Sequence, residues 1–264
     1  MRFERLFSRP DRPVAEQIEW KTVEVANPGA DFSMTVEMPR RWSQDAITIF
    51  AQRYLRRAGV PNVLRTREAH DRGTLPVHEG RVAPRWLFPR IATEDAIIGG
   101  ETSGRQVFER LAGGWTYWGW RSGLVTTWDD AEAFYDELYW MLAEQRAAPN
   151  SPQFFNSGLW WAYGIEGPDT GQWVCDPDGS PRRISNSYER PQPHACFLTS
   201  VSDDLVNDGG IMDLWVREAR IFKHGSGSGV NPSRIRAKGE KLSGGGAASG
   251  LLSFLEIGDR SAGA

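Results

Sequence analysis

The order of segments after residue 194 constrains the fold more than any other feature of this sequence. An apolar run at 195–201, ACFLTSV, is typical of a strand, and the apolar spacing of 211–225 is typical of a helix. Residues 230–236, VNPSRIR, then fit a second strand or an extended segment. A glycine-rich loop at 239–250 and the start of another helix at 249–258 follow. Strand, helix, strand, loop and helix in this order predict an α/β arrangement.

The preceding part of the chain is predicted to be mostly helical. Ser43 is a suitable N-cap for a helix over 43–57, and 127–148 has acidic residues in its first turn and apolar residues at helical spacing. Residues 20–39 contain two possible short strands around an Asn-Pro-Gly turn. Residues 58–100 contain proline and arginine without periodicity, and we expect them to be irregular and extended over the surface.

Two further stretches lie between these parts. Residues 148–165, APNSPQFFNSGLWWAYGI, indicate a turn, a short strand or loop, and an aromatic cluster. Residues 165–192 are rich in Gly, Pro and Asp and predict a surface excursion, with a hairpin around DPDGS at 176–180. Cys175 lies within this excursion.

Composition narrows the class of protein. With 264 residues, 40% of them hydrophobic and 25% charged, the chain can bury one large or two ordinary cores. Two cysteines are too few for a disulfide framework, so we expect a cytoplasmic protein. No apolar stretch approaches the ~18 residues of a membrane span. A net charge of −3 argues against nucleic-acid binding. Acidic residues lie between the Arg- and Trp-containing stretches 81–90 and 105–121, so we expect these stretches to be solvated surface.

Cys196 raises the sharpest question in the sequence. A lone cysteine in an apolar strand is more often a small core residue than a nucleophile. The neighbouring His194 and the loop-like segment 191–193 nevertheless place Cys196 at the start of its strand, where a thiol can be reached. Residue types alone leave both readings open. A zinc site made from these two residues with Cys175 and His224 matches no known ligand spacing, so we expect no metal site.

The glycine runs at 224–231, HGSGSGVN, and 242–250, LSGGGAASG, permit close approach of a phosphate to the backbone. Neither run is a P-loop, and the first follows a predicted helix where the dinucleotide fingerprint requires a strand. A helix C-cap followed by a flexible loop explains each run equally well.

Taken together, four ordered blocks resemble one enzyme family. They are VFERLAGGWTYWGW, AAPNSPQFFNSGLWWAYGI, PHACFLTSVSDDL and FKHGSGSGVNPSRIRAKGEKLSGGGAASGLLSF. From about residue 20 to the end, the chain resembles the N-terminal portion of the large form of adenosylcobalamin-dependent, class II ribonucleotide reductases. The resemblance implies reduction of ribonucleotides, diphosphates in this form, to 2′-deoxyribonucleotides. In that family a thiyl radical generated from the cobalamin abstracts the 3′ hydrogen, and a cysteine pair, restored by a thioredoxin-type reductant, supplies the electrons.

The resemblance also implies a fold. We expect an N-terminal reductase region over 1–100, a helical region over 101–150, and over 151–264 the first strands and helices of a ten-stranded α/β barrel, incomplete in this chain. The radical cysteine, the partner of Cys196 and most of the cobalamin surface are expected beyond residue 264. The chain alone is therefore expected to be inactive and to need a C-terminal piece, and the complete enzyme is expected to be a homodimer. The alternative is a non-catalytic nucleotide-binding or interaction fragment of a truncated or split enzyme.

Residue by residue, the resemblance assigns Cys196 as the first redox-active thiol, at the head of the first barrel strand. Ser151 matches the hydroxyl residue before proline in the substrate loop. Ala195 matches a residue whose backbone lies beside the ribose, and Gly227 matches the glycine that lets the substrate approach the chain. Cys175 matches no functional cysteine of the family.

A second group of residues is implied to bind the specificity effector, a deoxynucleoside triphosphate. Asp203 matches an acid that contacts the effector, and Arg236 matches a guanidinium that reaches its phosphates. Residues 243–250, with Gly244, Gly245 and Gly246, match the first specificity loop.

Overall fold

The computed structural model describes residues 1–26, 33–67, 77–78, 81–82, 84–176 and 178–264. The chain forms two compact units, Met1–Pro193 and His194–Ala264. Each unit has its own apolar clusters, and each is described below by itself.

The first unit begins with a short 3-10 helix, η1 (Val14–Gln17), and an antiparallel pair, β1 (Trp20–Ala26) and β2 (Ser33–Pro39). This pair confirms the two strands expected within residues 20–39, while the Asn-Pro-Gly turn lies outside the described residues. The next helix, α1 (Gln44–Arg53), is capped as expected, because the Ser43 side chain accepts a hydrogen bond from the backbone N–H of Ala46. Its apolar face is buried at Ile47, Phe50 and Ala51.

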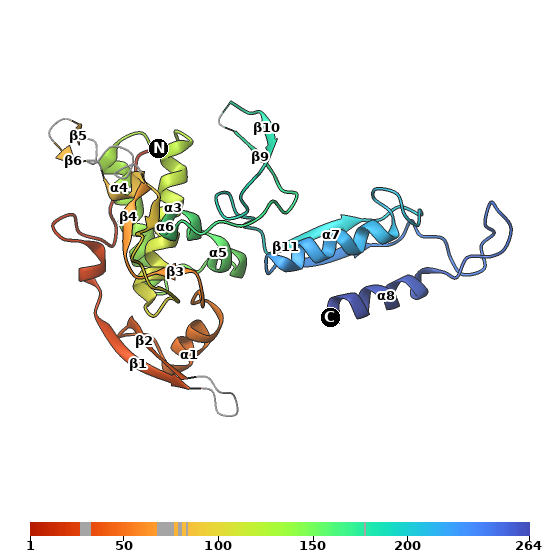
Figure 1. The fold of residues 1–264 in the computed structure, drawn as a ribbon, viewed down its shortest axis with the longest axis horizontal. Coiled ribbons are helices and arrows are strands. Elements are labelled where there is room, and N and C mark those ends of the chain that lie inside the picture. Colours follow the sequence, from red (N-terminus) through yellow and green to blue (C-terminus); the bar gives the residue numbers. More distant parts are fainter. Residues whose placement is uncertain (27–32, 68–76, 79–80, 83, 177) are drawn as a thin grey trace. The chain divides into compact units, whose positions relative to one another are not determined.

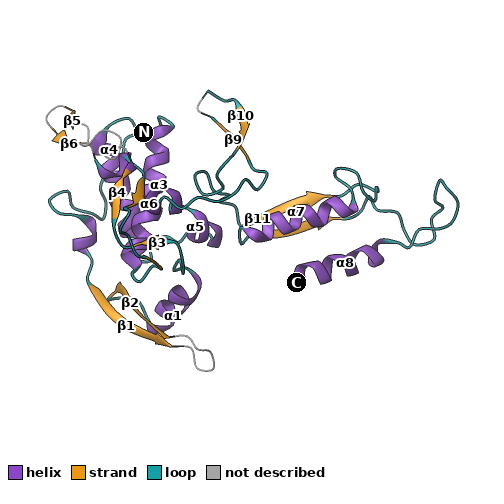
Figure 2. Ribbon diagram, in the orientation of Figure 1, coloured by secondary structure: helices purple, strands orange, loops and turns teal. Residues whose placement is uncertain are grey.

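Two long helices form the centre of the first unit (Figure 2). Helix α3 (Gly104–Arg121) starts with a capping box made by Ser103 and Gln106, and α4 (Trp128–Ala143) is capped by Thr127. Their contact buries Phe108, Leu111 and Tyr139 in one apolar cluster. The carboxylate of Glu137 on α4 accepts hydrogen bonds from the backbone N–H groups of Phe7 and Ser8, which fixes the N-terminal segment against this helix.

Residues 58–100 differ from the expectation of an irregular surface segment. They contain short antiparallel pairs and a 3-10 helix, namely β3 (Val60–Pro61) with β8 (Ile98–Gly99), β4 (Leu64–Thr66) with β7 (Arg90–Ala92), β5 (Val77–His78) with β6 (Arg81–Val82), and η2 (Arg85–Leu87). Trp86 and Phe88 are each only 5% exposed, so this part of the segment belongs to the core. The first unit is therefore mixed α and β, whereas the sequence predicted a mostly helical region.

Residues 148–165 also differ from the expected strand or loop, because they form two short helices, α5 (Ser151–Asn156) and α6 (Leu159–Tyr163). Gly158 joins them with φ of +77°, a left-handed conformation that L side chains rarely adopt. A Cβ at this position would lie 1.9 Å from the carbonyl oxygen of Arg110 on α3. Glycine is thus needed both for the turn and for close packing against α3. The expected hairpin follows, with β9 (Trp173–Cys175) antiparallel to β10 (Pro181–Arg183).

The second unit has the predicted strand, helix, strand and helix order. Strand β11 (Cys196–Ser200) is followed by α7 (Ile211–Lys223), β12 (Gly227–Asn231) and α8 (Leu251–Gly263), and the two strands pair in parallel. Helix α7 lies along this sheet (Figure 1), and Leu214 packs with Val201 and Val230. This arrangement confirms a mixed α/β fold. The two strands described in this unit form an open sheet, so no closed barrel is present among them.

Of the reading of the first glycine run as a helix C-cap and a flexible loop, the structure has the C-cap but not the loop. Gly225 does follow α7 with φ of +77°, as a C-cap glycine should. Residues from Gly227 onward are instead part of β12, so the strand begins three residues before the predicted segment at 230–236.

Candidate functional site

The first candidate site lies where the two parallel strands of the second unit begin. Cys196 is in register with Gly227, and the backbone N–H of Gly227 donates to the carbonyl oxygen of Ala195 at 2.6 Å. The hydroxyl of Ser226 donates to the carbonyl oxygen of His194 at 2.7 Å and ties the two strand entries together. Three of the four predicted substrate residues, 195, 196 and 227, therefore meet at one end of the sheet.

Cys196 is exposed within this unit. Along β11, exposed residues alternate with partly buried ones, so Cys196, Leu198 and Ser200 share one face of the strand. Phe197 and Thr199 point to the opposite face. The sequence left open whether Cys196 is a core residue or an accessible thiol, and in the described second unit its side chain is accessible.

Gly227 leaves space beside this thiol. A Cβ built at this position would lie 3.7 Å from Sγ of Cys196 and 3.8 Å from the carbonyl oxygen of Ala195, which are ordinary van der Waals distances. Its φ is also outside the left-handed region. Packing among the described residues therefore does not demand glycine here, in contrast to Gly158.

The fourth predicted substrate residue, Ser151, belongs to the first unit. It is the first residue of α5, whose N-cap is Asn150. The Ser151 hydroxyl is half-buried and shares a hydrogen bond with the hydroxyl of Tyr54, with 3.2 Å between the two oxygens.

Sequence reasoning missed a buried ion pair that fixes this part of the first unit. Arg110 and Glu101 are each 1% exposed, and Nε of Arg110 donates to Oε1 of Glu101 at 2.6 Å. Nη1 of Arg110 donates to the carbonyl oxygen of Ser157, at the end of α5, at 2.9 Å. The hydroxyl of Tyr163 on α6 donates to the same carboxylate at 2.8 Å. The sequence feature that could have indicated this buried pair is the single arginine inside the apolar helical run VFERLAGGW.

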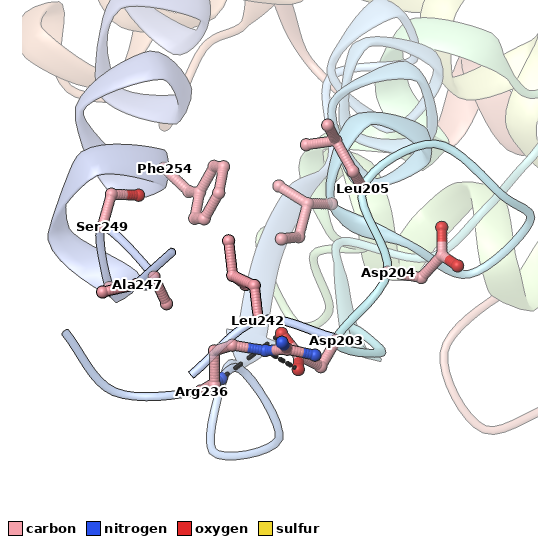
Figure 3. A pocket seen from close by; sticks show the side chains of 11 residues that line it. Asp203, Asp204, Leu205, Arg236, Leu242, Ala247, Ser249 and Phe254 are labelled. Atoms are coloured by element: carbon pink, nitrogen blue, oxygen red, sulfur yellow. Dashed lines mark hydrogen bonds and ion pairs between the residues drawn. The ribbon is translucent and has the colours of Figure 1, made fainter. Parts of the chain in front are cut away.

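A second candidate site is a cavity of about 380 Å³ in the second unit (Figure 3). Nε of Arg236 donates to Oδ2 of Asp203 at 2.5 Å, and the Arg236 backbone N–H donates to Oδ1 at 3.4 Å. Figure 3 shows the side chains of Leu205, Leu242 and Phe254 directed toward the same space. The cavity thus combines one ion pair with an apolar wall.

The predicted loop glycines do not line this cavity. Gly244, Gly245 and Gly246 form the tip of a turn in which the N–H of Leu242 donates to the carbonyl oxygen of Gly246 at 3.1 Å. The cavity is lined instead by the part of the same loop that follows the tip, Ala247–Gly250. The loop is therefore a hydrogen-bonded turn with a glycine tip, and its second half contributes to the site.

The neighbouring carboxylates Asp203 and Asp204 have different environments. Asp204 Oδ1 accepts hydrogen bonds from the backbone N–H groups of Asn207 at 2.8 Å and Val206 at 3.0 Å. These bonds, with that from the Asn207 side chain, lower the pKa of Asp204 below its ordinary value. In Figure 3 its carboxylate points away from the ion pair. Asp204 therefore shapes the turn before α7, while Asp203 faces Arg236.

No zinc site was expected from His194, Cys196, Cys175 and His224, and Cys175 belongs to a different unit from the other three. Among the residues that the structure describes, no group of three or more His, Cys, Asp or Glu side chains could hold a metal ion. Cys175 is exposed at the end of β9 in the first unit. His224 is buried at the end of α7, where burial, and then the charge of Lys223, lower its pKa. Within the described ranges, no helix has the length and apolar character needed to cross a membrane.

Family models of known proteins match a part of each of the two units. The family model for the ribonucleotide reductase barrel domain matches residues 194–264, and the family model described as class II vitamin B12-dependent ribonucleotide reductase matches residues 22–145. Two vitamin B12-dependent ribonucleotide reductases match the whole chain, at 50% identity in Agrobacterium fabrum and 51% in Bradyrhizobium diazoefficiens. A ribonucleoside-diphosphate reductase large subunit of Variola virus is 37% identical over 30% of the chain and 10% of its own length.

These matches define the class of the protein as ribonucleotide reductase. The chain belongs to the vitamin B12-dependent, class II ribonucleotide reductases. It spans about a fifth of the length of the two B12-dependent relatives, 21% in each case.

Proposed function

We propose that this chain forms the substrate-facing start of the catalytic barrel in an enzyme that reduces ribonucleotides to 2′-deoxyribonucleotides. The observation that carries the proposal is the accessible thiol of Cys196 in register with Gly227, on a face of the sheet that α7 does not cover. Since packing does not require glycine at 227, the space in front of the thiol is available to a ligand. Ala195 and Gly227 would present backbone to the ribose, and Ser151 would contribute a hydroxyl.

The chemistry proposed for Cys196 balances with a second thiol. Two thiols give up two electrons and two protons and form a disulfide, the 2′ carbon gains a hydrogen, and its hydroxyl leaves as water. The second thiol is assigned to a part of the enzyme outside this chain. A thioredoxin-type reductant would then reduce the disulfide by thiol exchange.

Adenosylcobalamin is the cofactor that we propose, and it would supply the radical that starts the reaction. The described residues offer no cluster of metal-ligating side chains, so no residue of this chain is assigned to the cobalt. Other parts of the enzyme would hold most of the cofactor.

The cavity beside Asp203 and Arg236 is proposed to bind a deoxynucleoside triphosphate effector. Arg236 uses Nε and its backbone N–H on Asp203, while its two Nη nitrogens have no hydrogen-bond partner within the described part of the chain. These N–H groups can donate to phosphate oxygens. Leu242 and Phe254 supply an apolar wall for a base or a sugar. The glycine tip at 244–246 would allow the loop to adjust when the effector binds.

The remaining properties extend this proposal to the whole enzyme. We propose a diphosphate substrate, which fits the name of the viral relative, and a cytoplasmic homodimer whose ten-stranded barrel is completed by other parts of the protein. The domain boundaries at residues 100/101 and 150/151 remain predictions. Nucleic acid and membranes are not among the proposed partners.

The proposed activity can be tested on a full-length protein that contains this chain. Incubation of a ribonucleoside diphosphate with adenosylcobalamin and a dithiol should yield the 2′-deoxy product, and a parallel reaction with the triphosphate separates the two substrate classes. Absence of deoxynucleotide from both substrates would contradict the proposal. Product formed from the triphosphate alone would contradict only the choice of diphosphate.

A further inference from the structure

Ser151 is held by a residue that neither the sequence nor the family resemblance singled out. Tyr54 ends α1, and its hydroxyl lies 3.2 Å from Oγ of Ser151, 97 positions away in the sequence. Both residues belong to the first unit. We infer that Tyr54 is a positioning residue that orients the Ser151 hydroxyl toward the substrate, an inference that rests on the proposed function of Ser151.

The ring of Tyr54 is fixed by aromatic neighbours on α5, the helix that begins with Ser151. Its centroid lies 4.6 Å from that of Phe154 and 5.7 Å from that of Phe155, with a nearly parallel arrangement in the second case. Ring contacts of this kind hold a side chain in one orientation. The Tyr54 hydroxyl is therefore placed by packing, independently of its bond to Ser151.

The backbone on both sides of this hydrogen bond is fixed by one guanidinium. Nη2 of Arg110 donates to the carbonyl oxygen of Tyr54 at 3.4 Å, and Nη1 donates to that of Ser157 at 2.9 Å. Arg110 itself is held by the buried carboxylate of Glu101. The end of α1 and the end of α5 are thus tied to the same buried ion pair, which keeps Tyr54 and Ser151 in register.

The direction of the hydrogen bond between Tyr54 and Ser151 determines whether the Ser151 hydroxyl can donate to a ligand. A serine hydroxyl has one O–H to donate and otherwise rotates among staggered positions. When the Tyr54 hydroxyl donates to Oγ of Ser151, the Ser151 O–H remains free to donate to a ligand. Such a chain of hydroxyl donors strengthens the final bond and favours an acceptor such as a phosphate or hydroxyl oxygen of a nucleotide.

The test uses the full-length reductase and steady-state kinetics with its ribonucleotide substrate. Tyr54→Phe keeps the ring and removes only the hydroxyl, so KM should rise about three- to tenfold with kcat nearly unchanged, as expected for loss of one hydrogen bond. Ser151→Ala should raise KM at least as much. The double variant should match Ser151→Ala alone, because Tyr54 acts through Ser151.

Tyr139→Phe is the matched control. It makes the same chemical change in the same unit, but the buried Tyr139 hydroxyl has no hydrogen-bond partner among the described residues. Its KM should equal that of the parent enzyme.

Three results would overturn the inference. An unchanged KM for Tyr54→Phe, while Ser151→Ala raises KM, removes Tyr54 and leaves the proposed role of Ser151 intact. A further rise in KM when Tyr54→Phe is added to Ser151→Ala shows that Tyr54 acts by another route. An unchanged KM for Ser151→Ala removes Ser151 from the proposed site and the Tyr54 inference with it.

Discussion

Arg236 holds Asp203 through its Nε and its backbone N–H, and so connects the segment after β12 to the segment after β11. The two residues are 33 positions apart in the sequence, and their side chains remain about one third exposed. The two Nη nitrogens of Arg236 have no hydrogen-bond partner among the described residues. This geometry gives the proposed effector cavity one oriented cationic group.

Replacement of Arg236 by alanine should weaken binding of the effector triphosphate about ten- to a hundredfold, because one charge-assisted contact is worth roughly 1.5–3 kcal/mol. Equilibrium binding of a labelled deoxynucleoside triphosphate to the full-length enzyme measures this. Arg234→Ala is the control, since Arg234 is exposed and does not line the cavity.

Asp203→Ala should alter which effector favours which substrate base. Unchanged effector dissociation constants in both the 203 and 236 variants would place the effector elsewhere.

Cys196→Ser should abolish multiple turnover in the full-length enzyme while substrate binding stays nearly intact. The hydroxyl occupies similar space but cannot form the disulfide that carries two electrons. Cys175→Ser should retain turnover, because Cys175 matches no functional cysteine of the family and is assigned no role in the proposed chemistry. Deoxynucleotide formation with a thioredoxin-type reductant is the measurement. Normal turnover by the Cys196 variant would show that its thiol is not redox-active.

Gly227→Ala should fold normally and bind substrate poorly. The added methyl group meets Cys196 Sγ only at 3.7 Å, so the melting temperature should change little. Because the methyl occupies the space proposed for the ribose, KM should rise about tenfold or more, as overpacking costs roughly 1–3 kcal/mol. Differential scanning fluorimetry and kinetics on the same preparations separate the two effects. An unchanged KM would mean that the substrate does not approach the chain at residue 227.

Arg110→Ala should lower the free energy of unfolding of the first unit by about 3–5 kcal/mol, because it leaves the Glu101 carboxylate buried without its cationic partner. Urea denaturation monitored by tryptophan fluorescence measures this. Arg40→Ala is the comparison variant in the same unit, since the pair of Arg40 with Glu19 is largely exposed and should contribute about 0.5 kcal/mol or less. Equal effects of the two variants would contradict the structural role of the buried pair.

Asp204→Ala should destabilise the second unit in a pH-dependent way. The folded-state pKa of Asp204 is lowered by hydrogen bonds to its carboxylate, so its contribution to stability is present above the ordinary pKa of an aspartate. That contribution is lost as the pH falls through the lower folded-state pKa. Thermal melts should therefore differ between parent and variant at pH 7 and converge in strong acid. A difference that grows as the pH falls would contradict this assignment.

The sequence by itself determined those features that depend on local chemistry. The Ser43 cap and the apolar spacing after it predicted α1, and the acidic first turn after Thr127 predicted α4. The alternation of strand and helix after residue 194 predicted the α/β unit, with Cys196 at the start of its first strand. Each of these signals lies within a few turns of chain, where periodicity and capping act.

Tertiary structure decided what depends on contacts between distant segments. Trp86 is buried although its surroundings show no periodicity, and α5 and α6 are too short to be stable without packing against α3. The glycine run from Gly227 becomes a strand because β11 supplies its hydrogen-bond ladder, which outweighs the low strand propensity of glycine. Burial of Arg110 requires Glu101 and two backbone carbonyls from other segments. The separate environments of the adjacent Asp203 and Asp204 likewise arise only when Arg236, 33 residues further along, folds back beside one of them.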